Sequence, residues 1–159
     1  MRRIFTIALF LFVTPALAQY WTHYANARFG YELDIPPGFE GQGESDSGDG
    51  QIFYLPQSLQ ELTVWGGLLG VTAETFEGEA ESRADAIMAA GWVISSASAT
   101  PSWATLSGTR TNQALYQRMI LLCDGESYAA FRITHPAKDL AAMSSVLEGL
   151  ARSFAPVDC

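Results

Sequence analysis

The stretch from Arg28 to Phe39, RFGYELDIPPGF, constrains the fold of this chain more than any other. In its first half, aromatic and aliphatic side chains occupy every second position and alternate with Gly, Glu and Asp. This period is typical of a strand with one buried face. Pro36 and Pro37 then end the strand, and a second strand signal, GDGQIFYLP, follows from Gly48 to Pro56. The two signals predict an opening pair of strands in a protein that contains a sheet.

Residues 1–18 have the features of a cleavable export signal. Two arginines precede an apolar run from Ile4 to Val13, and the sequence ALA supplies a small-x-small cleavage site before Gln19. About ten apolar residues are too few to span a bilayer core of about 30 Å, which argues against a transmembrane anchor. We expect cleavage after Ala18, a mature single domain of residues 19–159, and a periplasmic or secreted location in a bacterium.

The mature domain is strongly acidic. The whole chain contains nine basic and 17 acidic residues, a net charge of −8, and loss of Arg2 and Arg3 makes the net charge −10. This charge repels phosphate backbones and anionic lipids, so we expect no nucleic-acid partner and no membrane insertion after signal cleavage. The same charge can attract a cation or a basic protein, or can simply keep an exported protein soluble.

The two cysteines, Cys123 and Cys159, indicate one disulfide, because an isolated pair in an oxidising compartment is most simply bonded. The bond would close a loop of about 36 residues and contribute about 3–4 kcal/mol in the chain-entropy model. Two free thiols or a metal-binding pair are the alternatives.

An acidic, glycine-rich loop is predicted from Glu40 to Gly50, EGQGESDSGDG. Its second half resembles part of a calcium loop, but Gly48 stands where an oxygen ligand is needed and the distal bidentate Glu is absent. A flexible turn is the simpler interpretation, and cation binding is left open. The next strand contains Gly66-Gly67, a pair that is typical of a bulge or of a close approach by another backbone or a ligand.

A helix is predicted from Thr75 to Gly91, with an apolar side that contains Phe76 and Ile87. Arg83 lies in the middle of that side, so its guanidinium must reach solvent or find a carboxylate. The pattern leaves open whether Arg83 forms a structural ion pair or belongs to a functional site.

Four consecutive strands follow, at about residues 92–99, 103–111, 114–123 and 127–134. The run ALYQRMILLC in the third of these is apolar on both faces, which indicates a central strand covered on both sides. A terminal helix from about Ala137 to Phe154 would cover one face. Its predicted apolar stripe is Leu140, Met143, Leu147, Leu150 and Phe154.

The sequence contains no convincing catalytic or metal site. Ser127 lies in GESYA, which resembles a nucleophile elbow, but a strand follows where the elbow requires a helix. His135 is about 26 Å from Ser127 along the same extended strand. His23 is the other histidine, and no HxxxH or CxxC spacing is present. We predict no catalytic, cofactor-binding or metal-binding residue, and no enzymatic activity.

In element order the chain resembles the PsbP-like fold group, named for the extrinsic subunit of the plant oxygen-evolving complex. The resemblance rests on FGYELDIPPGF and on the succession of hairpin, helix, four-strand meander and closing helix that ends near Ser153-Phe154. It implies an α+β fold, an α/β/α sandwich around a central, mainly antiparallel sheet of about six to seven strands with two main helices. It supplies no site residues, because no position here matches a shared site motif.

Relatives of that shape mostly act as protein-binding accessory subunits, including a Ran-binding nuclear branch. The leading prediction is therefore a small exported accessory domain that binds another exported or envelope protein, without a cofactor. One alternative is a small-ligand or cation-binding periplasmic protein that uses the Glu44 to Asp49 loop beside Gly66-Gly67. A second alternative is a hydrolase of unrecognised type. The identity of the partner and the oligomeric state do not follow from the sequence.

Overall fold

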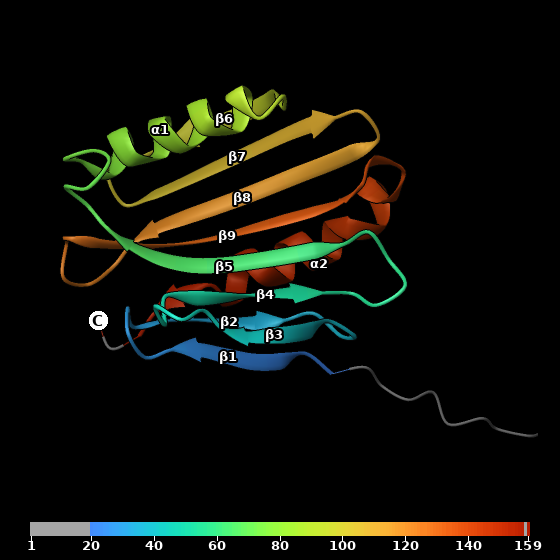
Figure 1. The fold of residues 1–159 in the computed structure, drawn as a ribbon, viewed down its shortest axis with the longest axis horizontal. Coiled ribbons are helices and arrows are strands. Elements are labelled where there is room, and N and C mark those ends of the chain that lie inside the picture. The colour runs from blue at the N-terminus through green and yellow to red at the C-terminus, as the bar shows by residue number, and fades with distance from the viewer. Residues whose placement is uncertain (1–19, 158) are drawn as a thin grey trace, which may run out of the picture.

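A computed structural model describes residues 20–157 and residue 159 (Figure 1). The predicted export signal at residues 1–18 lies outside the described residues. The described part contains two antiparallel sheets and two α-helices, with the larger sheet at the centre. No helix in this part of the chain is long and apolar enough to cross a membrane.

The large sheet has seven antiparallel strands in the order β3-β4-β5-β9-β8-β7-β6. These strands are β3 (Glu40–Glu44), β4 (Gly50–Tyr54), β5 (Glu61–Leu68), β6 (Val93–Ala99), β7 (Trp103–Arg110), β8 (Gln113–Leu121) and β9 (Ser127–Pro136). The small sheet has the order β1-β2-β10 and consists of β1 (Thr22–Asn26), β2 (Tyr31–Ile35) and β10 (Ala155–Pro156). The helices are α1 (Phe76–Ala89) and α2 (Leu140–Ser153), and a short 3-10 turn, η1 (Ala137–Asp139), precedes α2.

The predicted α+β class is confirmed, with seven strands in the central sheet and two main helices. The four-strand meander is β6 to β9, in which each strand pairs with the next along the chain. Helix α1 begins after Thr75, whose hydroxyl accepts a hydrogen bond from the backbone N–H of Gly78 at 3.1 Å. This N-cap satisfies a donor that the first turn of the helix would otherwise leave unpaired.

The strand that opens the chain lies outside the large sheet. β2 pairs with β1 on one side and with β10 on the other, and its apolar side chains are buried against the large sheet. One face of the large sheet is therefore covered by the small sheet together with α2, whereas the sequence predicted α2 alone. Figure 1 shows α2 behind β5 and β9, and the core on this side contains Leu33, Val64, Phe131 and Leu150.

Two sequence predictions were wrong in detail. The first half of the predicted Glu40 to Gly50 loop is the exposed edge strand β3, which pairs with β4. Leu140, placed in the buried stripe of α2, is 58% exposed because it stands at the first position of that helix, while Met143 and Leu150 are buried.

Helix α1 covers only part of the opposite face of the large sheet. It packs against β6 and β7 at one end of the sheet, as Figure 1 shows, and its buried residues Phe76 and Ile87 contact side chains of β7 and β8. The part of this face that belongs to β4 and β5 has no helix over it. The position of α1 therefore leaves half of one sheet face partly exposed.

Candidate functional site

The uncovered half of the sheet is lined by side chains from three neighbouring strands. We call it the open face, and it consists of Ile52, Tyr54, Thr63, Trp65 and Arg132. The cross-strand pairs Ile52–Thr63 and Thr63–Arg132 place these side chains on one side of β4, β5 and β9. On these strands Val64 and Phe131 face the small sheet and α2 and are buried. Thr63, Trp65 and Arg132 lie on the other side and are half-buried. Ile52 is 37% exposed and Tyr54 is 38% exposed.

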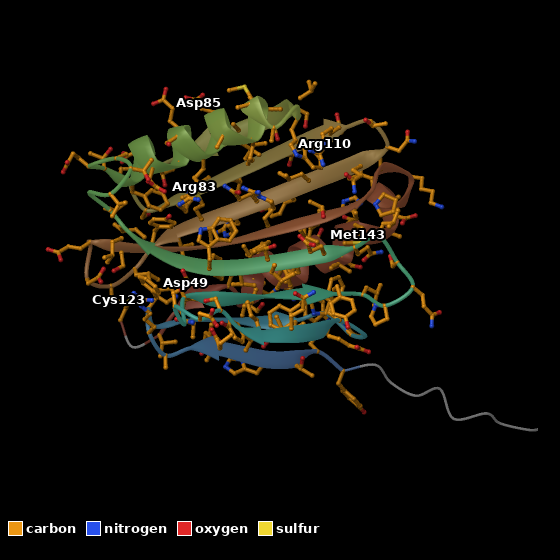
Figure 2. All side chains as sticks on the ribbon, viewed as in Figure 1. Asp49, Arg83, Asp85, Arg110, Cys123 and Met143 are labelled. Carbon is orange, nitrogen blue, oxygen red and sulfur yellow. A yellow bond between two sulfur atoms is a disulfide. The ribbon has the colours of Figure 1, made fainter. Side chains whose placement is uncertain are left out.

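Arg83 extends from α1 toward this face and is labelled in Figure 2. Its Nε donates to Glu79 Oε1 at 2.8 Å, and a second guanidinium nitrogen donates to the hydroxyl of Tyr128. Glu79 is fully buried, so Arg83 neutralises a carboxylate that water cannot reach. The structural ion pair, one of the two roles that the sequence left open for Arg83, is thus present. The guanidinium also lies over the ring of Trp65, with a centroid distance of 5.8 Å, and so borders the open face.

Arg132 approaches the same ring from β9, at 5.6 Å from its centroid. Its Nε and Nη2 both donate to Gln117 Oε1, at 3.0 and 2.8 Å. Burial and the nearby charge of Arg83 lower the pKa of Arg132, while Glu61 opposes this change. No ion pair among the described residues involves Arg132. Trp65 therefore contacts two cations, of which one has a carboxylate partner.

The residue types of the open face are those that are common at the centre of protein–protein interfaces. Trp, Tyr and Arg are enriched among residues that dominate the binding energy of protein–protein contacts. Trp65 also has a buried indole nitrogen with no hydrogen-bond partner in the described residues. The face offers aromatic and aliphatic side chains together with guanidinium groups, an arrangement that suits recognition of another protein.

Gly66 and Gly67 pair in regular register with Ala129 and Tyr128, so the bulge, one of the explanations that the sequence offered for this pair, is not present there. The glycines instead make room for aromatic side chains. A Cβ at position 66 would lie 2.4 Å from the ring of Phe29, and a Cβ at position 67 would lie 2.5 Å from the hydroxyl oxygen of Tyr128. Close packing of side chains, rather than of another backbone, explains the pair.

The turn between β3 and β4 is ordered by its own polar groups. The Ser45 hydroxyl donates to the Asp49 carboxylate and, as the main cause, lowers the pKa of that group. Asn26 Nδ2 donates to the Gly48 carbonyl at 2.9 Å, which ties the turn to the β1–β2 hairpin. The backbone N–H of Gly66 donates to the Asp49 carbonyl at 2.8 Å, so the loop does lie beside β5 as predicted. The described residues contain no cluster of three or more metal-ligating side chains.

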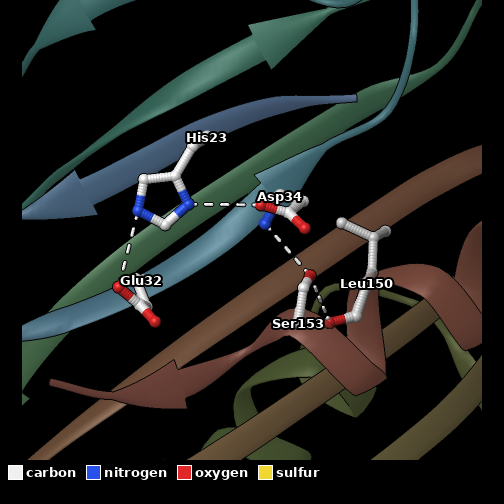
Figure 3. Close-up of polar contacts among 5 residues, drawn as sticks. All are labelled: His23, Glu32, Asp34, Leu150 and Ser153. Carbon is white, nitrogen blue, oxygen red and sulfur yellow. Dashed lines mark hydrogen bonds and ion pairs between the residues drawn. The ribbon is translucent and has the colours of Figure 1, made fainter. Parts of the chain in front are cut away.

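The two histidines and the candidate serine have other partners. Ser127 Oγ donates to Asp124 Oδ2 at 2.6 Å, and His135, which is buried, lies with Nδ1 2.8 Å from the carbonyl of Pro136. His23 lies between Glu32 and Asp34 on the small sheet, at 3.4 and 3.2 Å (Figure 3).

Figure 3 also draws Ser153, which uses its hydroxyl for backbone contacts. Its Oγ donates to the Leu150 carbonyl at 3.3 Å and accepts from the Asp34 backbone N–H at 3.0 Å. Neither this serine nor Ser127 forms a hydrogen bond with a histidine among the described residues. For the hydrolase alternative, the described residues therefore provide no contact between Ser127 or Ser153 and a histidine base.

Cys123 and Cys159 lie with their sulfur atoms at bonding distance and their Cα atoms 5.5 Å apart. Cys123 follows β8, and Cys159 follows β10 near the end of the chain. The contact joins the large sheet to the small sheet at the C-terminus.

A groove of about 460 Å³ lies between α1 and strands β6 to β8. Its lining is mainly apolar, with Ala80 and Ala84 on the helix and Leu106 and Met119 on the sheet. Polar residues also line it, among them Glu77, Glu81 and Gln117. This volume falls within the range of small-ligand pockets, about 300–1,000 Å³.

Sequence reasoning singled out Arg83 but missed Trp65 and Arg132. Both lie in strands that were predicted, yet neither interrupts the strand pattern. Only the pairing of β5 with β9 shows that they share a face, and a single sequence does not contain that pairing.

No protein-family model matches the chain, and no curated protein matches it in sequence. Solved structures do match in fold. The solution structure of cyanobacterial PsbP (CyanoP) from Synechocystis sp. PCC 6803 has a TM-score of 0.66 and 14% identity, covering 90% of this chain and 96% of that one. The crystal structure of the Saccharomyces cerevisiae Ran-binding protein Mog1p has a TM-score of 0.60 and 12% identity, covering 89% of this chain and 97% of that one. The chain thus has the PsbP-like fold that its sequence predicted.

Proposed function

We propose that the mature chain is an exported accessory domain that binds another exported or envelope protein through the open face. The observation that carries the proposal is the uncovered half of the sheet, where Trp65, Tyr54 and Ile52 remain accessible beside two arginines. A face of this composition, left without a helix, favours a protein partner.

The fold comparison supports the proposal by analogy only, since a fold does not determine function. One of the matching structures is described as a Ran-binding protein, which associates this fold with protein binding. Export is supported by the signal-like residues 1–18 and by the cysteine pair.

The binding test uses tagged mature protein, residues 19–159, as bait for the exported proteins of the producing cell. We expect the wild-type chain to retain at least one specific protein, and Trp65→Ala to lose it, because the central aromatic residue of an interface contributes about 2 kcal/mol or more. Trp103→Ala serves as the matched control, because this tryptophan on β7 is exposed and lies outside both the open face and the groove. Repeated absence of any specific retained protein, or equal retention by the Trp65 variant, would contradict the proposal.

The export test uses the full-length chain with a C-terminal tag. We expect the mature protein outside the cytoplasm to begin at Gln19, as read by N-terminal sequencing. An intact N-terminus on protein that stays in the cytoplasm would contradict the export part of the proposal.

The groove between α1 and β6 to β8 supports a second candidate function, binding of a small apolar ligand. A ligand that binds only the native state raises the melting temperature. We would screen a panel of apolar and amphipathic metabolites, with Ala84→Phe as the groove-filling variant. Shifts in the wild type that are absent in the variant support this candidate, and no shift with any compound rejects it.

A further inference from the structure

Arg132 is the positively charged residue of the open face, and no ion pair in the described part of the chain involves it. A guanidinium carries five N–H donors, and Gln117 Oε1 accepts two of them, which leaves three without an acceptor among the described residues. Arg132 is half-buried and lies in the middle of β9. Pairing of β9 with β5 and β8 holds its backbone in place on both sides. The chain thus holds a cation in place without completing its hydrogen bonds.

The lack of a carboxylate partner for Arg132 contrasts with the acidic character of the whole domain. The mature chain contains ten more acidic than basic residues, yet no carboxylate lies within ion-pair distance of Arg132 in the described part. The second guanidinium on the Trp65 ring, Arg83, is already paired with Glu79 and adds to the positive potential. Desolvation and this neighbouring charge lower the pKa of Arg132, while the carboxylate of Glu61 on β5 opposes the change from beyond ion-pair distance. A carboxylate supplied from outside and placed in contact with the guanidinium would offset its desolvation.

The rest of the open face indicates what accompanies the carboxylate. Ile52 and Tyr54 on β4 are more than a third exposed and lie on the same side of the sheet as Thr63 and Trp65. These side chains can cover an apolar residue that neighbours an acidic one in a partner's chain. A free dicarboxylate would leave this apolar surface uncovered.

We propose that the open face binds an acidic segment of the partner protein, in which an Asp or Glu side chain pairs with Arg132 over the ring of Trp65 and a neighbouring apolar side chain packs against Ile52 and Tyr54. The proposal rests on the proposed function and names the chemistry of its partner. It differs from the expectation drawn from net charge alone, under which an acidic domain attracts a basic protein.

The test selects peptides from a random displayed library against the mature wild-type protein. We expect the selected peptides to be enriched in Asp or Glu next to apolar residues. Their affinity for Arg132→Gln should fall at least about tenfold, since a charge-assisted pair at a partly desolvated site contributes more than about 1.4 kcal/mol. Arg110→Gln is the matched control, because Arg110 stacks on Trp92 in the same way but is exposed and lies outside the open face.

A second variant keeps Arg132 intact, in case its replacement disturbs the fold. Thr63 is the cross-strand neighbour of Arg132, so Thr63→Glu places a carboxylate of the chain itself beside the guanidinium. We expect this variant to have a higher melting temperature than Thr63→Gln and to bind the acidic peptides at least about tenfold more weakly. Binding of the peptides to the wild type should also weaken as salt is raised.

Four results would overturn the proposal: a library that yields no binders, selected peptides that are neutral or basic, acidic peptides that bind Arg132→Gln and Thr63→Glu as tightly as the wild type, or glutarate that binds as tightly as the peptides. The acidic-segment proposal can also fail while the proposed function holds. If the protein captured from cells is lost with Trp65→Ala but retained by Arg132→Gln, the open face is an interface and its partner is not recognised through a carboxylate.

Discussion

Arg83 and Arg132 contact the same indole ring but differ in what neutralises their charge. Arg83 has the buried carboxylate of Glu79, whereas Arg132 has an amide oxygen of Gln117. Arg83 therefore has a structural role, which can be measured as the stability of the free protein. Replacement of Arg132 is expected to weaken partner binding more than it lowers the stability of the fold.

Replacing Arg83 by Ala should destabilise the fold by about 3 kcal/mol, because the fully buried Glu79 carboxylate would lose the charged partner that it has among the described residues. The measurement is urea denaturation at neutral pH. Arg110→Ala is the control and should cost less than about 1 kcal/mol, since its contact with Trp92 is exposed. A loss for Arg83→Ala no larger than that of the control would show that Glu79 is not held as a buried anion.

Asp124 provides a prediction about pH. Its carboxylate accepts from the Ser127 hydroxyl and from two backbone N–H groups, and these bonds lower the pKa of Asp124 in the folded state. A folded-state pKa below the unfolded value adds stability above about pH 4, which is lost as the pH falls through the folded-state pKa. The stability difference between wild type and Asp124→Asn should be constant from about pH 5 to 8 and shrink below about pH 4. A difference that does not change in acid would contradict this account.

At the scale of elements, the sequence predicted the strands and helices whose residue pattern lies within a single segment. The alternation in YELDI, the helix that begins near Thr75 and the meander from β6 to β9 were all visible, because each depends on local spacing. The pairing of β2 with the two-residue strand β10 was not, because so short a strand has no period. The extent of sheet that α1 covers was also hidden, since it depends on packing between distant segments. The open face follows from that packing, which is why only Arg83 was foreseen as unusual.

Gly66 tests the packing of β5 against the small-sheet side. A Cβ at this position would lie 2.4 Å from the Phe29 ring, so Gly66→Ala should destabilise the protein by about 1–3 kcal/mol through overpacking. Gly41→Ala, in the exposed strand β3, meets only the ends of side chains at 3.1 Å or more and should cost less. Thermal denaturation of both variants measures the difference. Equal melting temperatures would show that the Phe29 ring moves aside freely.

At the scale of the whole molecule, the C-terminal segment joins the two sheets. β10 pairs with β2, the backbone N–H of Val157 donates to the Gly30 carbonyl at 2.8 Å, and Cys159 meets Cys123 beyond β8. Because β2 contributes to the core beneath the large sheet, this junction links the start, the middle and the end of the chain.

We propose that the cysteine pair is bonded in the exported protein and expect the Cys123→Ser, Cys159→Ser double variant to be less stable by about 3–4 kcal/mol in the chain-entropy model. Thiol titration of the denatured wild type should find no free thiol before reduction and two after it. Two thiols before reduction would reject the disulfide, and a double variant as stable as the wild type would reject its structural role.

The central claim is that the uncovered half of the large sheet is a protein-binding surface. The most direct measurement places a photo-reactive phenylalanine analogue at Thr63 in the open face, or at Ser145 on the exposed side of α2, in protein expressed by the producing cell. The account predicts a discrete cross-linked product with another exported protein from position 63 and none from position 145. No product from position 63, or the same products from both positions, would contradict it.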